Sequence, residues 1–155
     1  MRPSVRGVLL DEEDRLVVFR RTVPGRDLYW SIPGGHVEPG DGGLEDTLRR
    51  ELMEELGAAV TDVTPLTTLR YDLRGETKIQ HVYGCRLVSM DPALRSGPEL
   101  DDPSRGLYEV VRLPLDRSEI TSRRVVPEVM ADYLTEHITA LPHLIPGNPP
   151  DAEDT

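Results

Sequence analysis

Three glutamates close together in the chain have the residue type and the spacing to bind a metal cation. Glu51, Glu54 and Glu55 stand at positions i, i+3 and i+4, so on a helix they share one face within an arc of about 100°. Carboxylates this close repel one another unless a cation lies between them. Hard oxygen ligands in this number suit Mg²⁺ or Mn²⁺, which commonly accompany phosphate chemistry.

A solvated helix face is the alternative interpretation, since glutamate favours helices and most acidic helix faces bind nothing. The loop that precedes the glutamates, Pro33 to Asp41, favours the metal site. Its Gly34 and Gly35 allow backbone angles that other residues avoid, and they let the chain approach a ligand or an ion closely. A glycine loop that leads into an acidic helix is more specific than either feature alone.

A leucine repeat positions the acidic helix in the fold. Leucines recur every four residues and form an apolar stripe apart from the glutamates: Leu44, Leu48, Leu52 and Leu56. We therefore expect a helix from Leu44 to Leu56, ended by Gly57.

Residue alternation and turn residues predict the other elements. Strands are expected at residues 4–10, 15–21, 29–32, 60–73, 78–88 and 107–113, with a hairpin between the first two and an interruption at Pro65. A long loop is expected over 89–106, and a second helix over 125–141, ended by Pro142. Strands with one internal helix and one C-terminal helix predict an α+β architecture.

The glycine loop and the acidic helix together resemble the signature of the Nudix hydrolases, G-x5-E-x7-R-E-U-x-E-E-x-G-U, where U is aliphatic. Gly35 matches the first glycine and the segment Arg50–Ala58 matches the second half. The segment Tyr29–Gly35 also resembles the entry into this motif.

The chain departs from the family signature in the loop. Asp41 replaces a glutamate, and eight residues rather than seven separate it from Arg50. We expect the extra residue at Gly42–Gly43, where a loop can absorb it without changing the register of the helix. Asp41 is shorter than glutamate, and it reaches Arg50 only if the loop bends inward.

The resemblance implies a Nudix-type fold, in which a mixed sheet is sandwiched between helices. One domain would cover residues 1–141, and residues 142–155 would form a flexible, acidic, proline-rich tail. It also implies hydrolysis of a nucleoside diphosphate linked to another group, with Mg²⁺ or Mn²⁺ held by the glutamates at 51, 54 and 55 and by the Gly35 carbonyl. Arg50 would orient these acids.

Other site residues follow from the same resemblance. The family often adds a distant acid as a base or as a further metal ligand, and among the acids of the 89–106 loop we rank Glu99 first. Arg20 and Arg21 would hold substrate phosphates, with at most one of the pair facing the cleft because adjacent strand residues face opposite sides. Gly34 would approach the substrate through its backbone.

The substrate is the most open question in the sequence. Markers of the dinucleoside-polyphosphate and ADP-ribose branches, a tyrosine or a proline about fifteen to eighteen residues past the motif, are absent from Leu73–Glu76. We therefore expect a MutT-like enzyme for a (deoxy)nucleoside triphosphate or an oxidised nucleotide. The alternatives are an ADP-ribose, nucleotide-sugar or dinucleoside-polyphosphate hydrolase, a non-catalytic nucleotide-binding module, and an isoprenoid diphosphate isomerase that would use Cys85.

Composition limits the partners. The chain has 155 residues and a net charge of −10, which argues against a nucleic-acid polymer. No apolar run approaches the roughly 20 residues of a membrane span, and the N-terminus lacks an apolar signal region, so we expect no membrane partner and a cytoplasmic location. Cys85 is the only cysteine and is expected in the core. The family resemblance also allows a homodimer.

Overall fold

The computed structural model describes residues 3–147, apart from the side chains of Pro98 and Glu99. Its strands are β1 (Ser4–Leu10), β2 (Leu16–Thr22), β3 (Tyr29–Ser31), β4 (Gly34–His36), β5 (Ala58–Leu73), β6 (Glu76–Met90), β7 (Leu107–Leu113) and β8 (Val125–Val126). Its α-helices are α1 (Leu44–Leu56), α2 (Pro98–Asp101), α3 (Arg117–Thr121), α4 (Glu128–His137) and α5 (Leu141–Leu144), and two 3₁₀ turns are η1 (Pro92–Leu94) and η2 (Pro103–Arg105).

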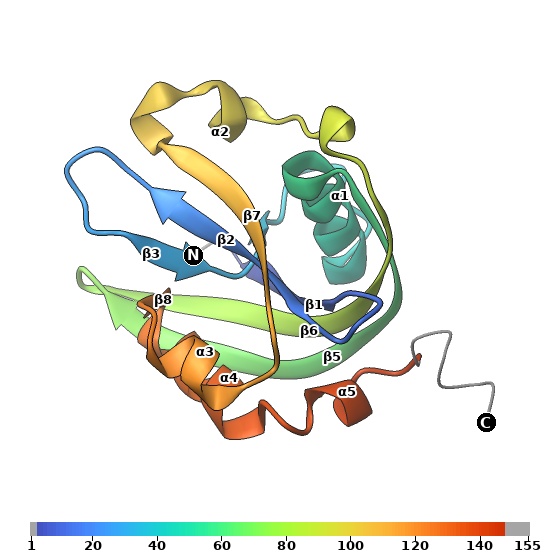
Figure 1. Ribbon diagram of the computed structural model, residues 1–155. Helices are drawn as coiled ribbons and strands as arrows, with labels where there is room; N and C mark the ends of the chain where they lie inside the picture. The colour runs from blue at the N-terminus through green and yellow to red at the C-terminus, as the bar shows by residue number, and fades with distance from the viewer. Residues whose placement is uncertain (1–2, 148–155) are drawn as a thin grey trace.

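The strands of the described residues form one curled mixed sheet with helices on both faces (Figure 1). The strand order is β5-β6-β1-β2-β3-β8, while β4 pairs with β1 and β7 pairs with β2. The pairs β1–β6 and β3–β8 are parallel, and the other pairs are antiparallel. The predicted α+β architecture, a mixed sheet between helices, is confirmed.

Apolar side chains build a separate core on each face of the sheet. Along β1, Val5 and Leu9 belong to the core beneath α1, while Val8 and Leu10 belong to the core beneath α4. Successive side chains of a strand point to opposite faces, so one buried strand supplies both cores. Leu48, Leu52 and Leu56 of the leucine stripe are fully buried in the core beneath α1 and Leu44 is partly buried against it, as the four-residue repeat predicts.

Helix α1 has the bounds predicted from the sequence. Gly57 ends it in the left-handed conformation with φ of 67°, and its N–H donates to the Leu52 and Met53 carbonyls. A Cβ on Gly57 would overlap the Asp91 carbonyl, so the position also requires glycine for space. Gly42 and Gly43, where we expect the extra loop residue, lie before the helix, and all three glutamates lie within it.

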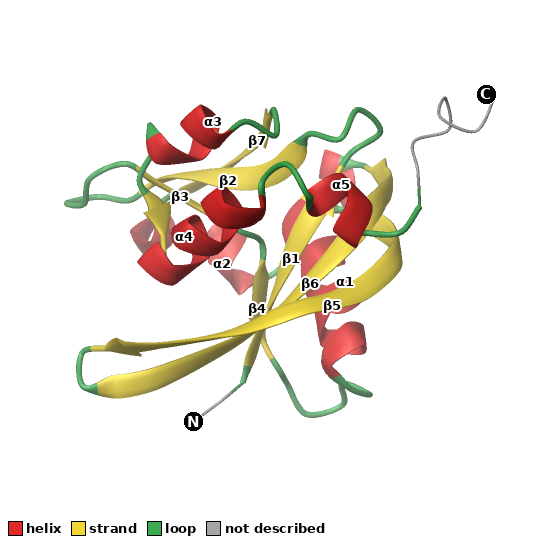
Figure 2. Ribbon diagram, turned by 90° about the horizontal axis from the view of Figure 1, so that it is seen from below, coloured by secondary structure: helices red, strands yellow, loops and turns green. Residues whose placement is uncertain are grey.

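The hairpin of β1 and β2 is confirmed, and the long pair β5–β6 extends beyond the rest of the sheet. Only Gln80–Arg86 of β6 pair with β1, so the turn at Arg74–Gly75 lies at the end of a projecting two-stranded ribbon (Figure 2). Pro65 does not interrupt β5. The register instead shifts between Thr61 and Thr64 and between Pro65 and Thr67, which are bulges that accommodate the proline within the strand.

Several predicted elements were wrong. The glycine loop contains β4, which pairs with β1, and the expected 89–106 loop contains the turns η1 and η2 and the short helix α2. The helix expected over 125–141 is divided into β8, α4 and α5. Pro127 has no N–H to donate and precedes α4, while Pro142 lies in the first turn of α5, where a missing N–H costs nothing.

Helix α3 was not predicted from the sequence. Its local signal is Asp116, which caps the helix by accepting a hydrogen bond from the Ser118 N–H. No helix of the described residues is both long and apolar enough to cross a bilayer.

The ordered domain continues past the predicted boundary at residue 141. Ile145 is buried in the core beneath α4, and the Arg86 guanidinium donates to the Pro142, Ile145 and Pro146 carbonyls. These bonds fix the segment 142–146 against β6. The rest of the predicted tail, residues 148–155, lies outside the described residues.

Candidate active site

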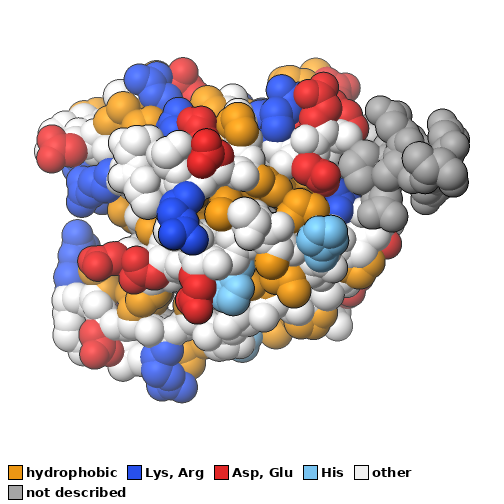
Figure 3. Space-filling model, turned by 60° about the horizontal axis from the view of Figure 1, so that its bottom comes forward, with side chains coloured by type: hydrophobic (Ala, Val, Ile, Leu, Met, Phe, Trp, Pro, Cys, Tyr) orange, Lys and Arg blue, Asp and Glu red, His pale blue; other side chains and the backbone are white. Residues whose placement is uncertain are grey.

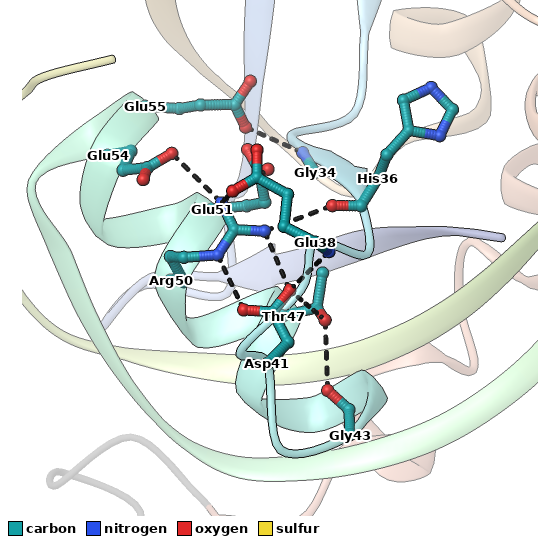
Figure 4. Close-up of polar contacts among 10 residues, drawn as sticks. All are labelled: Gly34, His36, Glu38, Asp41, Gly43, Thr47, Arg50, Glu51, Glu54 and Glu55. Carbon is teal, nitrogen blue, oxygen red and sulfur yellow. Dashed lines mark hydrogen bonds and ion pairs between the residues drawn. The ribbon is translucent and has the colours of Figure 1, made fainter. Parts of the chain in front are cut away.

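Helix α1 presents Glu51, Glu54 and Glu55, here called the acidic face, towards the strand β4 (Figure 4). Glu51 and Glu55 are each only 7% exposed, and Glu54 is half-buried. The Gly34 N–H donates a hydrogen bond of 2.9 Å to Glu55 Oε1. Two carboxylates are therefore buried side by side on one helix, at a position where a charge needs a partner.

The backbone of β4 passes unusually close to the acidic face. A Cβ on Gly35 would lie 2.5 and 2.7 Å from the two carboxylate oxygens of Glu51. A Cβ on Gly34 would overlap the Val5 carbonyl oxygen, because β4 pairs directly with β1. Glycine is thus required at position 34, and at position 35 a larger residue would displace the Glu51 carboxylate, as the sequence predicts for a loop beside an ion or a ligand.

Arg50 lies among four acids at the edge of this face. Its Nη1 is 3.0 Å from Glu51 Oε1, 3.3 Å from Glu54 Oε2 and 3.6 Å from Glu38 Oε2. Its Nη2 also donates to the His36 carbonyl at 3.1 Å. One guanidinium therefore links the acidic face to the loop that carries the glycines and offsets part of the repulsion between the carboxylates.

Asp41 reaches Arg50 despite being one methylene shorter than glutamate. Arg50 Nε lies 2.9 Å from Asp41 Oδ1 and Nη2 lies 3.0 Å from Oδ2, which is a bidentate pair. The hydrogen bond from Arg50, followed by those from the Glu38 N–H and the Thr47 hydroxyl, holds the pKa of Asp41 well below its usual range. Asp41 in turn raises the pKa of Arg50. The loop bends inward, as this pairing requires.

Two residues that support the acidic face are not among those predicted from the sequence. Thr47 is buried, and its hydroxyl lies 2.8 Å from Asp41 Oδ2 and 3.1 Å from the Gly43 carbonyl oxygen. Arg95 donates from Nε to the Glu55 carbonyl at 2.6 Å, which places a cation at the C-terminal end of α1. Thr47 could have been found from its place one helical turn before Arg50. Arg95 lies 40 residues from its partner and has no local signal.

The acidic face offers the donors that a hard divalent ion binds. Carboxylate oxygens of Glu51, Glu54 and Glu55 and the backbone carbonyl of Gly35 match the oxygen preference of Mg²⁺ and Mn²⁺. The close approach of Gly35 to Glu51 supports this fit. Among the described residues no three His, Cys, Asp or Glu side chains are arranged as a complete metal site, and Glu54 is turned towards Arg50.

A cleft of about 670 Å³ opens on the other side of β1, between the end of the β5–β6 ribbon and the start of α4, and we call it the ribbon cleft. Figure 3 shows the molecule hollowed at its left edge, with basic and acidic side chains on the rim. Four arginines line the ribbon cleft, against three carboxylates: Arg6, Arg21, Arg26 and Arg124, with Asp72, Glu128 and Asp132. The volume is within the usual range for small-molecule sites.

The ribbon cleft is close in the chain to the acidic face. Ile32 lines the cleft, and two residues later the Gly34 N–H binds Glu55. Arg6, another lining residue, pairs with Gly34 in the β1–β4 ladder and donates from Nη1 to the Ile32 carbonyl at 3.1 Å. A ligand in the ribbon cleft would therefore lie beside the strand that carries both glycines.

The predicted pair Arg20 and Arg21 separates as expected for neighbours on a strand. Arg21 is buried, lines the ribbon cleft and lies 3.5 Å from the centre of the Tyr108 ring. Arg20 is instead paired with Glu109 at 3.3 Å and is not part of the cleft wall, so its contact with substrate stays a prediction. The Gly34 N–H donates to Glu55, and the contact of Gly34 with substrate also stays a prediction.

Glu99 and Cys85 are two other residues that were given possible roles from the sequence. The backbone of Glu99 lies in α2, but its side chain is outside the described residues, so its role stays a prediction. Cys85 is fully buried in the core beneath α1, and burial raises its pKa to about 12. A thiol held neutral in a core supports packing and gives no support to the isomerase alternative.

Comparison with known sequences identifies the family. The sequence model of the NUDIX domain matches residues 1–129. The nucleoside triphosphatase NudI of Salmonella heidelberg (strain SL476) is 43% identical over 65 residues, which are 41% of this chain and 43% of that protein. The chain thus matches less than half the length of this curated relative.

Comparison with solved structures gives the same fold. A NUDIX hydrolase from Nitrosomonas europaea superposes with a TM-score of 0.69 at 20% identity, covering 97% of this chain and 94% of the other. The MutT protein of Methanosarcina mazei Go1 superposes with a TM-score of 0.62 at 21% identity, covering 90% and 93%. At these identities the likeness shows a shared fold.

Proposed function

This chain belongs to the NUDIX family, and we propose that it is a metal-dependent hydrolase of nucleoside diphosphates linked to another group. One observation carries the proposal: Glu51 and Glu55 are buried together on α1, against a strand whose glycines leave room only for them. Burying two carboxylates is unfavourable unless a cation or hydrogen bonds compensate. A binding module with no metal would have no evident need for this arrangement.

The residues divide the task. Glu51, Glu54, Glu55 and the Gly35 carbonyl would hold Mg²⁺ or Mn²⁺, which neutralises phosphate oxygens and lowers the pKa of a bound water. Arg50 and Asp41 would keep Glu51 and Glu54 in place through the ion pairs described above. The Gly34 N–H fixes one oxygen of Glu55.

In the reaction, the oxygen of a water molecule forms a bond to phosphorus and the bridging P–O bond breaks. The leaving phosphate takes the electron pair of that bond, and the water gives up its proton to a base. Glu99 is our proposal for this base or for a further metal ligand. The four cleft arginines would attract the anionic substrate towards an otherwise acidic protein.

A (deoxy)nucleoside triphosphate, or an oxidised form of one, is the substrate we favour. The partial match to a nucleoside triphosphatase supports this class, and the ribbon cleft has the volume for a nucleoside. ADP-ribose, nucleotide sugars and dinucleoside polyphosphates remain the alternatives. Cytoplasmic location, the lack of a nucleic-acid partner and a homodimer stay predictions.

A substrate panel tests the proposal directly. Phosphate and pyrophosphate release would be measured with Mg²⁺ for nucleoside triphosphates, ADP-ribose, nucleotide sugars and dinucleoside polyphosphates. We expect wild type to cleave a nucleoside triphosphate and Glu55→Gln to lose that activity. Glutamine keeps an oxygen for the Gly34 N–H, so the variant removes the charge and spares the loop.

Glu45→Gln is the matched control, because Glu45 is exposed on the same helix and pairs only with Arg49 among the interactions described. It should retain wild-type turnover. Failure of the wild type to cleave any compound of the panel would reject the hydrolase and leave the non-catalytic module.

A further inference from the structure

Two polar atoms in the ribbon cleft have no hydrogen-bond partner among the described residues. They are Nε of Arg6 and Oε1 of Gln80, and both atoms are buried. Gln80 is only 5% exposed, and both residues line the cleft. Buried polar groups nearly always have partners, since an unmet group loses its hydrogen bonds to water and gains nothing in return. Two such atoms in one cleft point to a ligand that completes them.

The sheet register brings these two side chains together. In the parallel pair β1–β6, Ser4 lies opposite Gln80 and Arg6 lies opposite Val82. Arg6 and Gln80 are therefore diagonal neighbours on adjacent strands. Val8 and Val82 belong to the core beneath α4, so Arg6 and Gln80 project on that same face.

Existing contacts decide which atoms remain for a ligand. Arg6 Nη1 donates to the Ile32 carbonyl, which orients the guanidinium, and its Nε can only donate. Gln80 Nε2 lies 3.3 Å from the Tyr71 hydroxyl, so the amide oxygen is the acceptor left over. The cleft thus offers one fixed donor beside one fixed acceptor.

Resting on the proposed function, we propose that Arg6 and Gln80 read the base of the substrate and select a lactam edge. In that edge a ring N–H stands beside a carbonyl, as in uracil, thymine and hypoxanthine. The carbonyl accepts from Arg6 Nε and the ring N–H donates to Gln80 Oε1.

Amino bases fit this pair less well. Adenine and cytosine present a ring nitrogen beside an NH₂ group. The second N–H of that group would have no acceptor in the Arg6–Gln80 pair. A buried N–H without a partner is rarer in proteins than a buried carbonyl without one, and it is less favourable. Paired recognition of adenine by glutamine needs both groups of the amide. Gln80 Nε2 is already bound to Tyr71.

Nucleotide pairs that differ only at this edge provide the test: UTP against CTP, and ITP against ATP. We expect wild-type kcat/KM to be about ten-fold or more higher for UTP and ITP, as is typical of an unmet buried hydrogen bond. Gln80→Leu and Arg6→Met should bring both ratios close to one. Ser89→Ala, an exposed change on the same strand, should leave them unchanged. Thermal melting confirms that each variant folds.

Equilibrium binding separates this inference from the hydrolase proposal. Calorimetry with UMP and CMP in the absence of metal reports base selection without turnover. Tighter binding of UMP that is lost in Gln80→Leu supports the inference even if no compound is cleaved. Equal affinity for UMP and CMP in wild type, or a preference that Gln80→Leu retains, overturns it.

Discussion

The acidic face of α1 and the ribbon cleft are both polar sites in the same small domain, but they differ in how completely the protein satisfies them. Asp41 beside the acidic face accepts hydrogen bonds from Arg50, from Thr47 and from the Glu38 N–H. In the cleft, Arg6 and Gln80 each keep one buried atom without a partner among the described residues. The first site is preorganised by its own contacts, whereas the second is complete only with a ligand.

This difference matches the tasks we assign to the two sites. Chemistry on a phosphate requires carboxylates held in one geometry, because small displacements of catalytic groups are costly. Recognition of a base requires groups that gain a bond only when the right ligand arrives. Substitutions in the two regions should therefore affect different measured quantities.

The largest expected effect is a loss of turnover, without a loss of UMP binding, when a glutamate of the acidic face is replaced. Glu51→Gln should lower kcat by roughly 10²–10³-fold, the magnitude typical for loss of one group that stabilises developing charge. Calorimetric binding of UMP to the ribbon cleft should change by less than about two-fold, since UMP binding there needs no catalytic charge. Parallel losses of turnover and UMP affinity would show that the two regions act as one unit.

Gly35→Ala tests the close approach of β4 to the acidic face. The added methyl group would displace the Glu51 carboxylate, so Mn²⁺ affinity and turnover should each fall by about 10–100-fold. Gly42→Ala is the control, because the methyl group there meets only the end of the exposed Asp46 side chain. An unchanged Mn²⁺ affinity in Gly35→Ala would contradict the proposed metal geometry.

Asp41→Asn tests the support beneath the acidic face. Turnover at pH 7 should fall by about ten-fold, because residues that orient metal ligands commonly contribute this much. Stability should also fall at pH 7. The pKa of Asp41 is lowered in the folded protein, first by Arg50, so its contribution is present above the unfolded value of about 3.9 and is lost as the pH falls further.

Urea unfolding of wild type and Asp41→Asn between pH 7 and pH 2 measures this contribution. The difference in stability should be constant down to about pH 4 and then narrow as the wild type loses the charge. A difference that persists unchanged at pH 2 would mean that Asp41 acts through its shape and not its charge.

The smallest expected effects are changes in folding stability caused by one substitution beside the acidic face and one in the ribbon cleft. Thr47→Val removes a buried hydroxyl that is hydrogen bonded, and it should cost about 1 kcal/mol. Gln80→Leu removes an amide oxygen that has no partner, and it should cost less than Thr47→Val or stabilise the protein. Thermal melting of both variants decides the order, and a larger loss in Gln80→Leu would show that its amide is already satisfied.

The same contrast explains what the sequence could predict. The acidic face is local: the glutamates, their register and the Arg50 pairing lie within one helix and the loop before it, so spacing alone determines them. The ribbon cleft joins residues from Arg6 to Asp132, and the parallel pairing of β1 with β6 is what brings Arg6 and Gln80 together. No local periodicity encodes such a pairing.

Elements that depend on tertiary contacts were missed for the same reason. Strand β4 is recognisable only because it pairs with β1, and Arg95 reaches α1 from 40 residues away. The division between α4 and α5 did have a local signal, in Pro127 and Pro142, but the apolar pattern across them favoured one continuous helix. Proline positions were therefore the better guide to the ends of these helices.

Titration with Mn²⁺, followed by electron paramagnetic resonance, tests the central claim most directly. Wild type and Glu45→Gln should bind the ion with equal affinity, while Glu51→Gln and Glu55→Gln should each bind it at least about ten-fold more weakly. The measurement needs no substrate and no turnover. Equal affinity in all four proteins would show that the acidic face does not hold a metal.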